Sequence, residues 1–248
     1  MRNSFSLVIV AALSYVGAVA QSQPARSPRA AEGQPAGPDQ SMDWAALGRY
    51  AAANAAVPPP APGHPRIVFM GDSITESWAG RRAGFFERNG YVGRGISGQT
   101  SPQMLLRFHQ DVVALTPAAV VILAGTNDVA ENTGPATDEQ IIDNLAAMAE
   151  IAGAHGIKVV IGSVPPATTF FWRREAVPAP RIKALNAKIK AWAQAQKITY
   201  ADFWAAMALP DGTMEPANSD DTVHPNAAGY GIMEPIVQAA IAEALKKP

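Results

Sequence analysis

IVFMGDSIT, residues 67–75, is the stretch that decides the fold. It starts with a short apolar run typical of a buried β-strand, which stops at Gly71-Asp72-Ser73, where a helix is predicted to begin. A serine at the carboxyl end of a parallel strand lies at the edge of the sheet where open α/β folds bind ligands. The free N–H groups of the following helix favour negative charge at the same place. Ser73 is therefore a candidate nucleophile, although a plain strand-to-helix turn capped by Asp72 or Ser73 explains the same residues.

Outward from this stretch, apolar runs alternate with helical patterns. A continuous apolar run such as residues 118–123 is typical of a strand covered on both faces. Strands separated by helices form βαβ units, which build a parallel sheet between two helical layers. We therefore predict an α/β fold: a three-layer αβα sandwich with a mainly parallel, flavodoxin-like sheet of about five strands. The predicted strands are residues 67–70, 91–97, 118–123, 157–163 and 198–202, and the predicted helices are residues 102–115, 138–155, 181–196 and 227–245.

Residues 1–20 have the features of a secretory signal peptide. Arg2 supplies a positive charge, residues 5–16 are apolar, and Ala18-Val19-Ala20 has the small-x-small pattern of a cleavage site. The alternative is a membrane anchor, but the apolar run is shorter than the roughly 20 residues that a span needs. We therefore expect an exported protein, periplasmic or extracellular, with no stable membrane insertion.

The rest of the chain divides into a linker and one domain. Residues 21–41 are rich in Pro, Ala, Gly, Ser and Gln, which predicts a disordered linker. Residues 42–248 are long enough for a single domain with a sizeable core. A helical pattern that opens at Asp43 and continues through Tyr50 to Ala53 is expected to pack on this domain.

Composition excludes several classes of function. The formal net charge is −1 and there is no basic run, so we expect no attraction to nucleic acid or to an anionic membrane. The chain contains no cysteine, which excludes disulfides, thiol catalysis, lipid attachment through a cysteine and cysteine-type zinc sites.

His224 follows Asp221 by three residues in a polar loop just before the last predicted helix. An acid at this spacing can accept the Nδ1–H of the imidazole and leave Nε2 to take a proton from a serine. Asp220 is an adjacent alternative for the acid, and a histidine that is merely exposed in a polar loop is the other explanation.

Asn127 and Gly98 also follow strand-like runs, so the sheet is expected to bring them to the same edge as Ser73. The side-chain amide of Asn127 can donate to an oxyanion without adding charge. Gly98 can offer a backbone N–H with no side chain in the way of a substrate, although it can also be a simple turn glycine. Asp128 cannot donate as a carboxylate and is interpreted as a cap or a support for its loop.

Four segments of this chain resemble the sequence blocks of the SGNH (GDSL-type) hydrolases, in the order of that family. They are Gly71-Asp72-Ser73, the segment around Gly98, Gly125-Thr126-Asn127-Asp128 and Asp221-Thr222-Val223-His224-Pro225. The likeness spans residues 66–248, and the first block has Ile74 where the nickname of the family has leucine. Residues 93–100 and 224–226 are most similar to bacterial lysophospholipase-like and carbohydrate-esterase-like members.

The resemblance implies a serine esterase that needs no metal and no cofactor. Ser73 is the implied nucleophile, and Ser73 N–H, Gly98 and Asn127 are the implied oxyanion donors. His224 is the implied base with Asp221 behind it, because the three-residue spacing of the family favours Asp221 over Asp220.

The expected substrate is a small-molecule or polysaccharide ester, either a short-chain acyl ester or an acetylated carbohydrate. Phe171 and Trp172 are candidate substrate-binding residues, although packing in the core or in a lid explains them equally well. A lysophospholipase or long-chain lipase, an acyltransferase and a non-enzymatic glycan-binding protein remain as alternatives. The sequence assigns no oligomeric state.

Two other enzyme classes lack their signatures here. An α/β-hydrolase needs Gly-x-Ser-x-Gly, which no serine of this chain has. A two-metal phosphoesterase needs several histidine and carboxylate ligands at the strand ends, whereas His224 is the one histidine in a motif.

Overall fold

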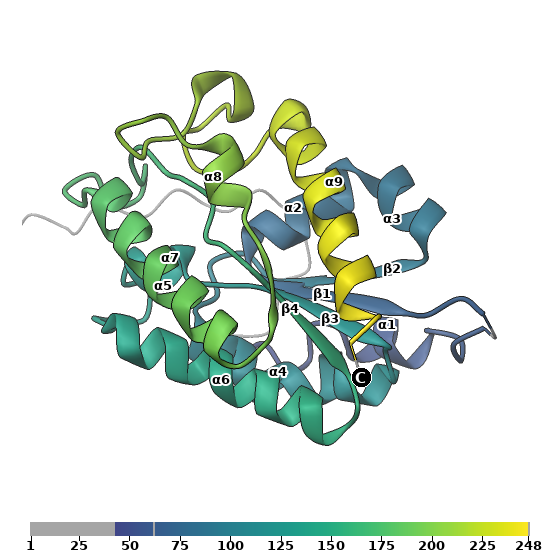
Figure 1. Cartoon of the computed structure of the whole chain (residues 1–248). Coiled ribbons are helices and arrows are strands. Elements are labelled where there is room, and N and C mark those ends of the chain that lie inside the picture. The colour runs from purple at the N-terminus through teal and green to yellow at the C-terminus, as the bar shows by residue number, and fades with distance from the viewer. Residues whose placement is uncertain (1–42, 62, 248) are drawn as a thin grey trace, which may run out of the picture. The chain divides into compact units, whose positions relative to one another are not determined.

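The computed structural model describes residues 43–61 and 63–247, and their centre is a parallel sheet of five strands (Figure 1). The strand order is β2-β1-β3-β4-β5, which is the flavodoxin-like order, so the predicted fold class is confirmed. The predicted leader and linker lie outside the described residues. The strands are β1 (Ile67–Gly71), β2 (Tyr91–Gly95), β3 (Ala119–Leu123), β4 (Lys158–Gly162) and β5 (Thr199–Ala201).

Helices cover both faces of the sheet (Figure 1). Alternate residues of β1 point to opposite faces: Val68 and Met70 pack into the core under α4, α6 and α7, whereas Ile67 and Phe69 pack into the core under α2, α3, α8 and α9. The helices are α1 (Ala51–Ala55), α2 (Ser73–Arg81), α3 (Ala83–Asn89), α4 (Ser101–Asp111), α5 (Thr126–Val129), α6 (Asp138–Ala154), α7 (Pro178–Ala195), α8 (Phe203–Met207) and α9 (Ala227–Ala244), with short 3₁₀ turns at Val113–Leu115 and Pro216–Asn218.

Strand β2 ends at Gly95, two residues before the end predicted at residue 97. Beyond the strand, the backbone N–H of Ser97 donates to the Glu76 carboxylate of α2 at 2.9 Å, which turns the chain away from the sheet. Gly95 permits this arrangement, because a Cβ there would lie 2.2 Å from the backbone nitrogen of Glu76 and 2.6 Å from the carbonyl oxygen of Asp72. The close contact holds the segment after β2 against the start of α2, where Ser73 lies.

The helix predicted from Asp43 to Ala53 is wrong over most of its length, since the chain forms turns until α1 begins at Ala51. The Asp43 carboxylate accepts from the N–H groups of Leu47 and Gly48, at 2.8 and 3.0 Å. Ala46 has a φ of 53°, which is outside the helical region. The hydrogen bonds from these backbone N–H groups to the Asp43 side chain and the left-handed conformation of Ala46 together prevent a continuous helix.

Arg107 of α4 is fully buried and ties together the segments beneath the site. Its guanidinium donates to the carbonyl oxygens of Gly71 and Arg94 at 2.8 and 2.9 Å, which lie at the ends of β1 and β2. It also donates to Gln99 Oε1 at 2.6 Å and forms an ion pair with the buried Asp111 at 3.0 Å. This side chain therefore fixes three segments that lead into the site.

Candidate active site

Ser73 is the first residue of α2 and lies two positions after the end of β1. Asp72 is the N-cap of this helix, because its Oδ1 accepts from the N–H of Ile74 at 2.9 Å. The predicted cap by Asp72 is confirmed, and Ser73 stands at the amino end of the helix, where the candidate nucleophile was expected. The N–H groups of a first helical turn have no partner within the helix and favour negative charge nearby.

The loop before α9 brings His224 to Ser73. Ser73 Oγ lies 2.8 Å from His224 Nε2, although the two residues are 151 positions apart in the chain. On the other side of the ring, His224 Nδ1 lies 2.6 Å from Asp221 Oδ2. Asp220 is directed elsewhere, since its Oδ1 accepts from Asn226 Nδ2 at 3.2 Å. The acid that contacts the imidazole is thus Asp221.

Asp221 is held by its own loop in a form suited to orient the ring. Oδ1 accepts from the backbone N–H groups of His224 and Val223 at 2.7 and 3.0 Å. Burial alone raises the pKa of the Asp221 carboxyl, but these hydrogen bonds and the one from the imidazole outweigh it and hold the pKa below its ordinary value. The ionised carboxylate therefore favours a proton on Nδ1 and leaves Nε2 free to accept from Ser73.

Asn127 lies in the second position of α5 and its side chain is almost completely buried. Its Nδ2 donates to the carbonyl oxygen of Gln99 at 3.0 Å and, over a longer 3.3 Å, to Asp72 Oδ2. Gly98 precedes this carbonyl and has a φ of 78°, a left-handed conformation that glycine adopts without strain. The segment after β2 thereby lies against the amide of Asn127.

Two buried carboxyls support this arrangement. Burial raises the pKa of Asp72 to about 7, since its hydrogen bond from Ile74 only partly offsets the loss of solvent. Burial also raises the pKa of Asp128, which accepts from the N–H and the hydroxyl of Ser101 at the start of α4. Asp128 therefore supports its loop, as the sequence indicated.

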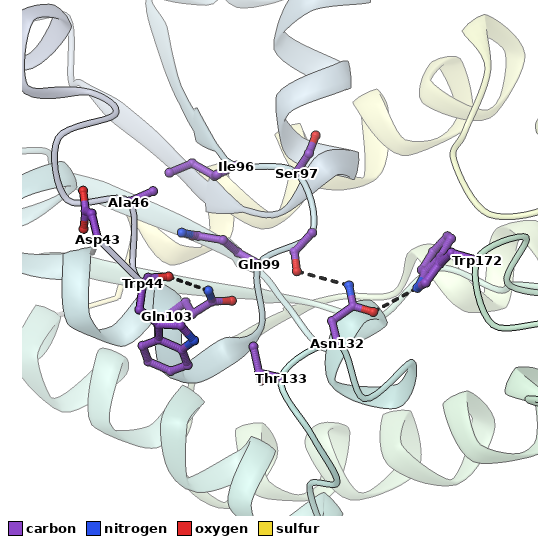
Figure 2. A pocket seen from close by; sticks show the side chains of 11 residues that line it. Asp43, Trp44, Ala46, Ile96, Ser97, Gln99, Gln103, Asn132, Thr133 and Trp172 are labelled. Atoms are coloured by element: carbon purple, nitrogen blue, oxygen red, sulfur yellow. Dashed lines mark hydrogen bonds between the residues drawn. The ribbon is translucent and has the colours of Figure 1, made fainter. Parts of the chain in front are cut away.

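Asn132, which no sequence pattern indicated, connects several parts of the site. Its Nδ2 donates to Asn127 Oδ1 at 2.9 Å. Nδ2 also donates to the carbonyl oxygen of Gly98 at 3.2 Å, and Oδ1 accepts from Trp172 Nε1 at 2.9 Å (Figure 2). Its signal in the sequence is only its position five residues after Asn127, just past α5. Asn132 fixes which way the amide of Asn127 faces, because it occupies the oxygen of that amide.

The predicted residues meet around one pocket of about 380 Å³. Phe171 and Trp172 form its apolar side, with ring centroids 4.7 Å apart, and the Phe171 ring lies 6.3 Å from the His224 ring. Phe171 and Trp172 are 56% and 39% exposed, so both belong to the surface of the site and neither to the core. The pocket is lined by Ser73, Ser97, Gly98, Asn127, Asn132, Phe171, Trp172 and His224.

The residues that form this arrangement, a serine hydroxyl bonded to an imidazole that is in turn bonded to a carboxylate, lie within the range that matches a known family. Residues 69–232 match the model of the GDSL-like lipase/acylhydrolase family. The chain belongs to this family. As a GDSL-family lipase/acylhydrolase it is an ester hydrolase, and its substrate is an ester.

Solved structures of two Bacteroides proteins agree with this assignment. A GDSL-like lipase from Bacteroides thetaiotaomicron is 48% identical, with a TM-score of 0.78, and the match covers 81% of this chain and 99% of that one. A candidate acylhydrolase from Bacteroides fragilis is 46% identical over 82% of this chain and 99% of that one, with a TM-score of 0.79. An acetylxylan esterase from Geobacillus stearothermophilus shares the fold at 19% identity and a TM-score of 0.56, over 74% of this chain and 95% of that one. The chain has no match among curated proteins.

Two further properties concern the GDSL-family domain that the structure describes. Residues 43–61 and 63–247 contain no group of three or more His, Asp or Glu side chains arranged to hold a metal ion. No helix in the same residues combines the length and the apolar character that a membrane crossing requires.

Proposed function

We propose that this GDSL-family ester hydrolase is an exported serine esterase that cleaves short-chain acyl esters or acetylated carbohydrates through an acyl-enzyme. The observation that carries the catalytic part is the chain of two short hydrogen bonds, 2.8 Å from Ser73 Oγ to His224 Nε2 and 2.6 Å from His224 Nδ1 to Asp221 Oδ2. These distances are within reach of proton transfer without rearrangement.

In the first half of the reaction, Ser73 Oγ attacks the ester carbonyl carbon while its proton passes to His224 Nε2. The N–H groups of Ser73 and Gly98 and the amide of Asn127 stabilise the oxyanion that forms. Asn127 Nδ2 makes two hydrogen bonds, and the longer one, to Asp72 Oδ2 at 3.3 Å, must break before this nitrogen can donate to the oxyanion. The carbonyl then re-forms, and the alcohol leaves with the proton of His224, giving the acyl-serine.

In the second half, His224 Nε2 takes a proton from water, and the resulting hydroxide attacks the acyl-serine carbonyl. The same donors stabilise the second oxyanion. Collapse breaks the bond to Ser73 Oγ, which recovers its proton from His224, and the carboxylic acid is released. An acyltransferase differs only in using another alcohol in place of water.

The pocket beside Ser73 supports a short acyl group. A long acyl chain needs an extended apolar channel. Among the described residues, only two large apolar side chains line this pocket, those of Phe171 and Trp172. Acetylxylan esterases among the solved structures share the fold at 19% identity, which makes acetylated glycans reasonable test substrates.

A series of p-nitrophenyl esters of increasing acyl length, together with acetylated xylan, tests the proposal. We expect kcat/KM to be highest for acetyl and butyryl esters, and we expect Ser73→Ala to abolish turnover while the circular dichroism spectrum is unchanged. A steep rise in kcat/KM with acyl length would instead indicate a lysophospholipase or long-chain lipase. Glycan binding without turnover of any ester would indicate a binding protein.

Export is proposed from the leader-like residues 1–20 alone. Expression of the full chain should give a mature protein in the periplasmic or extracellular fraction, with a new N-terminus near residue 21. A protein that retains Met1 in the cytoplasm would contradict export and leave the esterase proposal intact.

A further inference from the structure

A second cavity of about 550 Å³ adjoins the pocket of the nucleophile (Figure 2). The two share Ser97, Gly98, Asn132 and Trp172, so a ligand can extend from one into the other. The volume lies within the roughly 300–1,000 Å³ typical of small-molecule sites. Its outer side is formed by the turn segment before α1, through Asp43, Trp44 and Ala46.

Two side-chain hydrogen bonds hold the outer side of the cavity in place. Gln103 Nε2 of α4 donates to the carbonyl oxygen of Trp44 at 2.6 Å, and the buried Gln99 donates to that of Ala45 at 2.8 Å. These bonds hold the turn segment across the rim of the sheet domain. The indoles of Trp44 and Trp172 lie on opposite sides of the cavity (Figure 2) and are 48% and 39% exposed.

The chemistry of the lining favours an uncharged ligand rich in hydroxyls. Hydrogen bonds from Gly48 and Leu47 hold the pKa of Asp43 below its ordinary value, so its carboxylate is ionised and accepts from hydroxyl donors. Thr133 adds a hydroxyl, which also bonds the hydroxyl of Thr100 at 3.0 Å. The residues that line the two cavities include no Lys and no Arg, so an anionic group such as a phosphate has no cation to pair with.

We propose that this cavity binds the alcohol part of the substrate and that this alcohol is a saccharide. The inference rests on the proposed esterase function and deepens it. The acyl group then lies beside Phe171, the scissile ester lies at the shared boundary near Gly98 and Asn132, and sugar rings lie between the two indoles. Exposed indole faces provide apolar area for the faces of sugar rings, and Asp43 and Thr133 bond their hydroxyls.

The test compares two substrates with the same acyl group, p-nitrophenyl acetate and an acetylated xylo-oligosaccharide. Trp44→Ala removes the half-exposed indole but keeps the backbone carbonyl that Gln103 bonds. We expect the ratio of kcat/KM for the oligosaccharide to that for p-nitrophenyl acetate to fall about tenfold, through KM. Trp44→Phe should restore most of the ratio, because it keeps an aromatic face.

Leu47→Ala is the matched control. Leu47 lies in the same segment and is 42% exposed, but it does not line the cavity, so the ratio should stay at the parent value. Thr133→Val is a second, isosteric variant and should lower the ratio with only a small change in the melting temperature, since Thr133 is exposed and loses a single hydrogen bond, to the Thr100 hydroxyl.

The outcomes separate this inference from the proposed function. Turnover of p-nitrophenyl acetate without turnover of acetylated oligosaccharides, or an equal loss on both substrates in Trp44→Ala, overturns the saccharide subsite and leaves the esterase. Trp44-dependent turnover of lysophosphatidylcholine alone overturns it in favour of a cationic headgroup between the indoles. Failure of the parent on every ester overturns the proposed function itself.

Discussion

Replacement of Asn132 by alanine tests how the site holds the proposed oxyanion donors. The change removes the hydrogen bond to Asn127 Oδ1 at 2.9 Å, the bond to the Gly98 carbonyl at 3.2 Å and the acceptor of Trp172 Nε1. Asn132 is exposed, so its removal leaves no cavity in the core. The amide of Asn127 keeps its hydrogen bonds to Gln99 and Asp72, so its side chain becomes more mobile but does not rotate by 180°.

The size of the effect follows from these bonds. Loss of a whole oxyanion donor costs about 3–4 kcal/mol in the barrier, which sets the expected loss in Asn127→Ala at about 100- to 1,000-fold in kcat. A hydrogen bond that water can partly replace contributes about 0.5–1.5 kcal/mol. We therefore expect Asn132→Ala to lower kcat about 5- to 10-fold, with little change in KM for p-nitrophenyl acetate, because the loss falls on the transition state.

Steady-state kinetics on four proteins completes the test: the parent, Asn127→Ala, Asn132→Ala and the double variant. If Asn132 acts through Asn127, the double variant should be only slightly slower than Asn127→Ala, since a support has no effect once the supported group is gone. The reasoning is refuted if the two losses in kcat multiply, or if Asn132→Ala changes KM and leaves kcat at the parent value.

Three other changes address separate parts of the structure. Asp221→Asn should lower kcat about 1,000- to 10,000-fold, a smaller loss than in Ser73→Ala. The asparagine amide favours the His224 tautomer that carries its proton on Nε2, and this nitrogen then cannot accept from Ser73. Full activity of the variant would transfer the acid role to Asp220. For Asp72→Asn, denaturant titrations at several pH values should compare the free energy of unfolding of the variant with that of the parent. The variant's value minus the parent's should increase steadily from about pH 4 to about pH 8. The reason is that burial raises the pKa of Asp72 from 3.8 to about 7. In the parent, the protonated carboxyl contributes its full stability below pH 3.8, and this contribution is lost as the pH rises through about 7. A difference between variant and parent that does not vary with pH would contradict this. Arg107→Leu should lower the free energy of unfolding by about 3–5 kcal/mol, because it leaves the buried Asp111 carboxylate without its cation. A change below about 1 kcal/mol in chemical denaturation would show that the guanidinium is not needed to hold the strand ends.

The sheet was predictable because buried parallel strands have a simple signature. Residues 118–123 are continuously apolar, and β3 occupies Ala119–Leu123 with both faces covered. The position of Ser73 followed from the same logic, since a residue just after a parallel strand must lie at the carboxyl edge of the sheet. The order of the family blocks then indicated which residues come to that edge.

Other features depend on contacts that the sequence pattern does not encode. The spacing of Leu47, Tyr50 and Ala53 is helical, yet Asp43 takes the backbone N–H groups of Leu47 and Gly48 and the chain forms turns. Arg107 looks like a solvated helical residue but is fully buried, because its partners are strand-end carbonyls distant in sequence. Asn132 belongs to no strand end, so no sheet-edge argument leads to it.

The distance along the chain between Ser73 and His224, 151 residues, has a consequence for when the protein becomes reactive. Until the last loop docks, the hydroxyl has no proton acceptor and is no more nucleophilic than any serine in water. Under the proposed mechanism, we therefore expect a nascent or C-terminally truncated chain to be inactive. Hydrolysis is then expected to begin only once both ends of the domain have come together, which would make turnover a direct readout of completed folding.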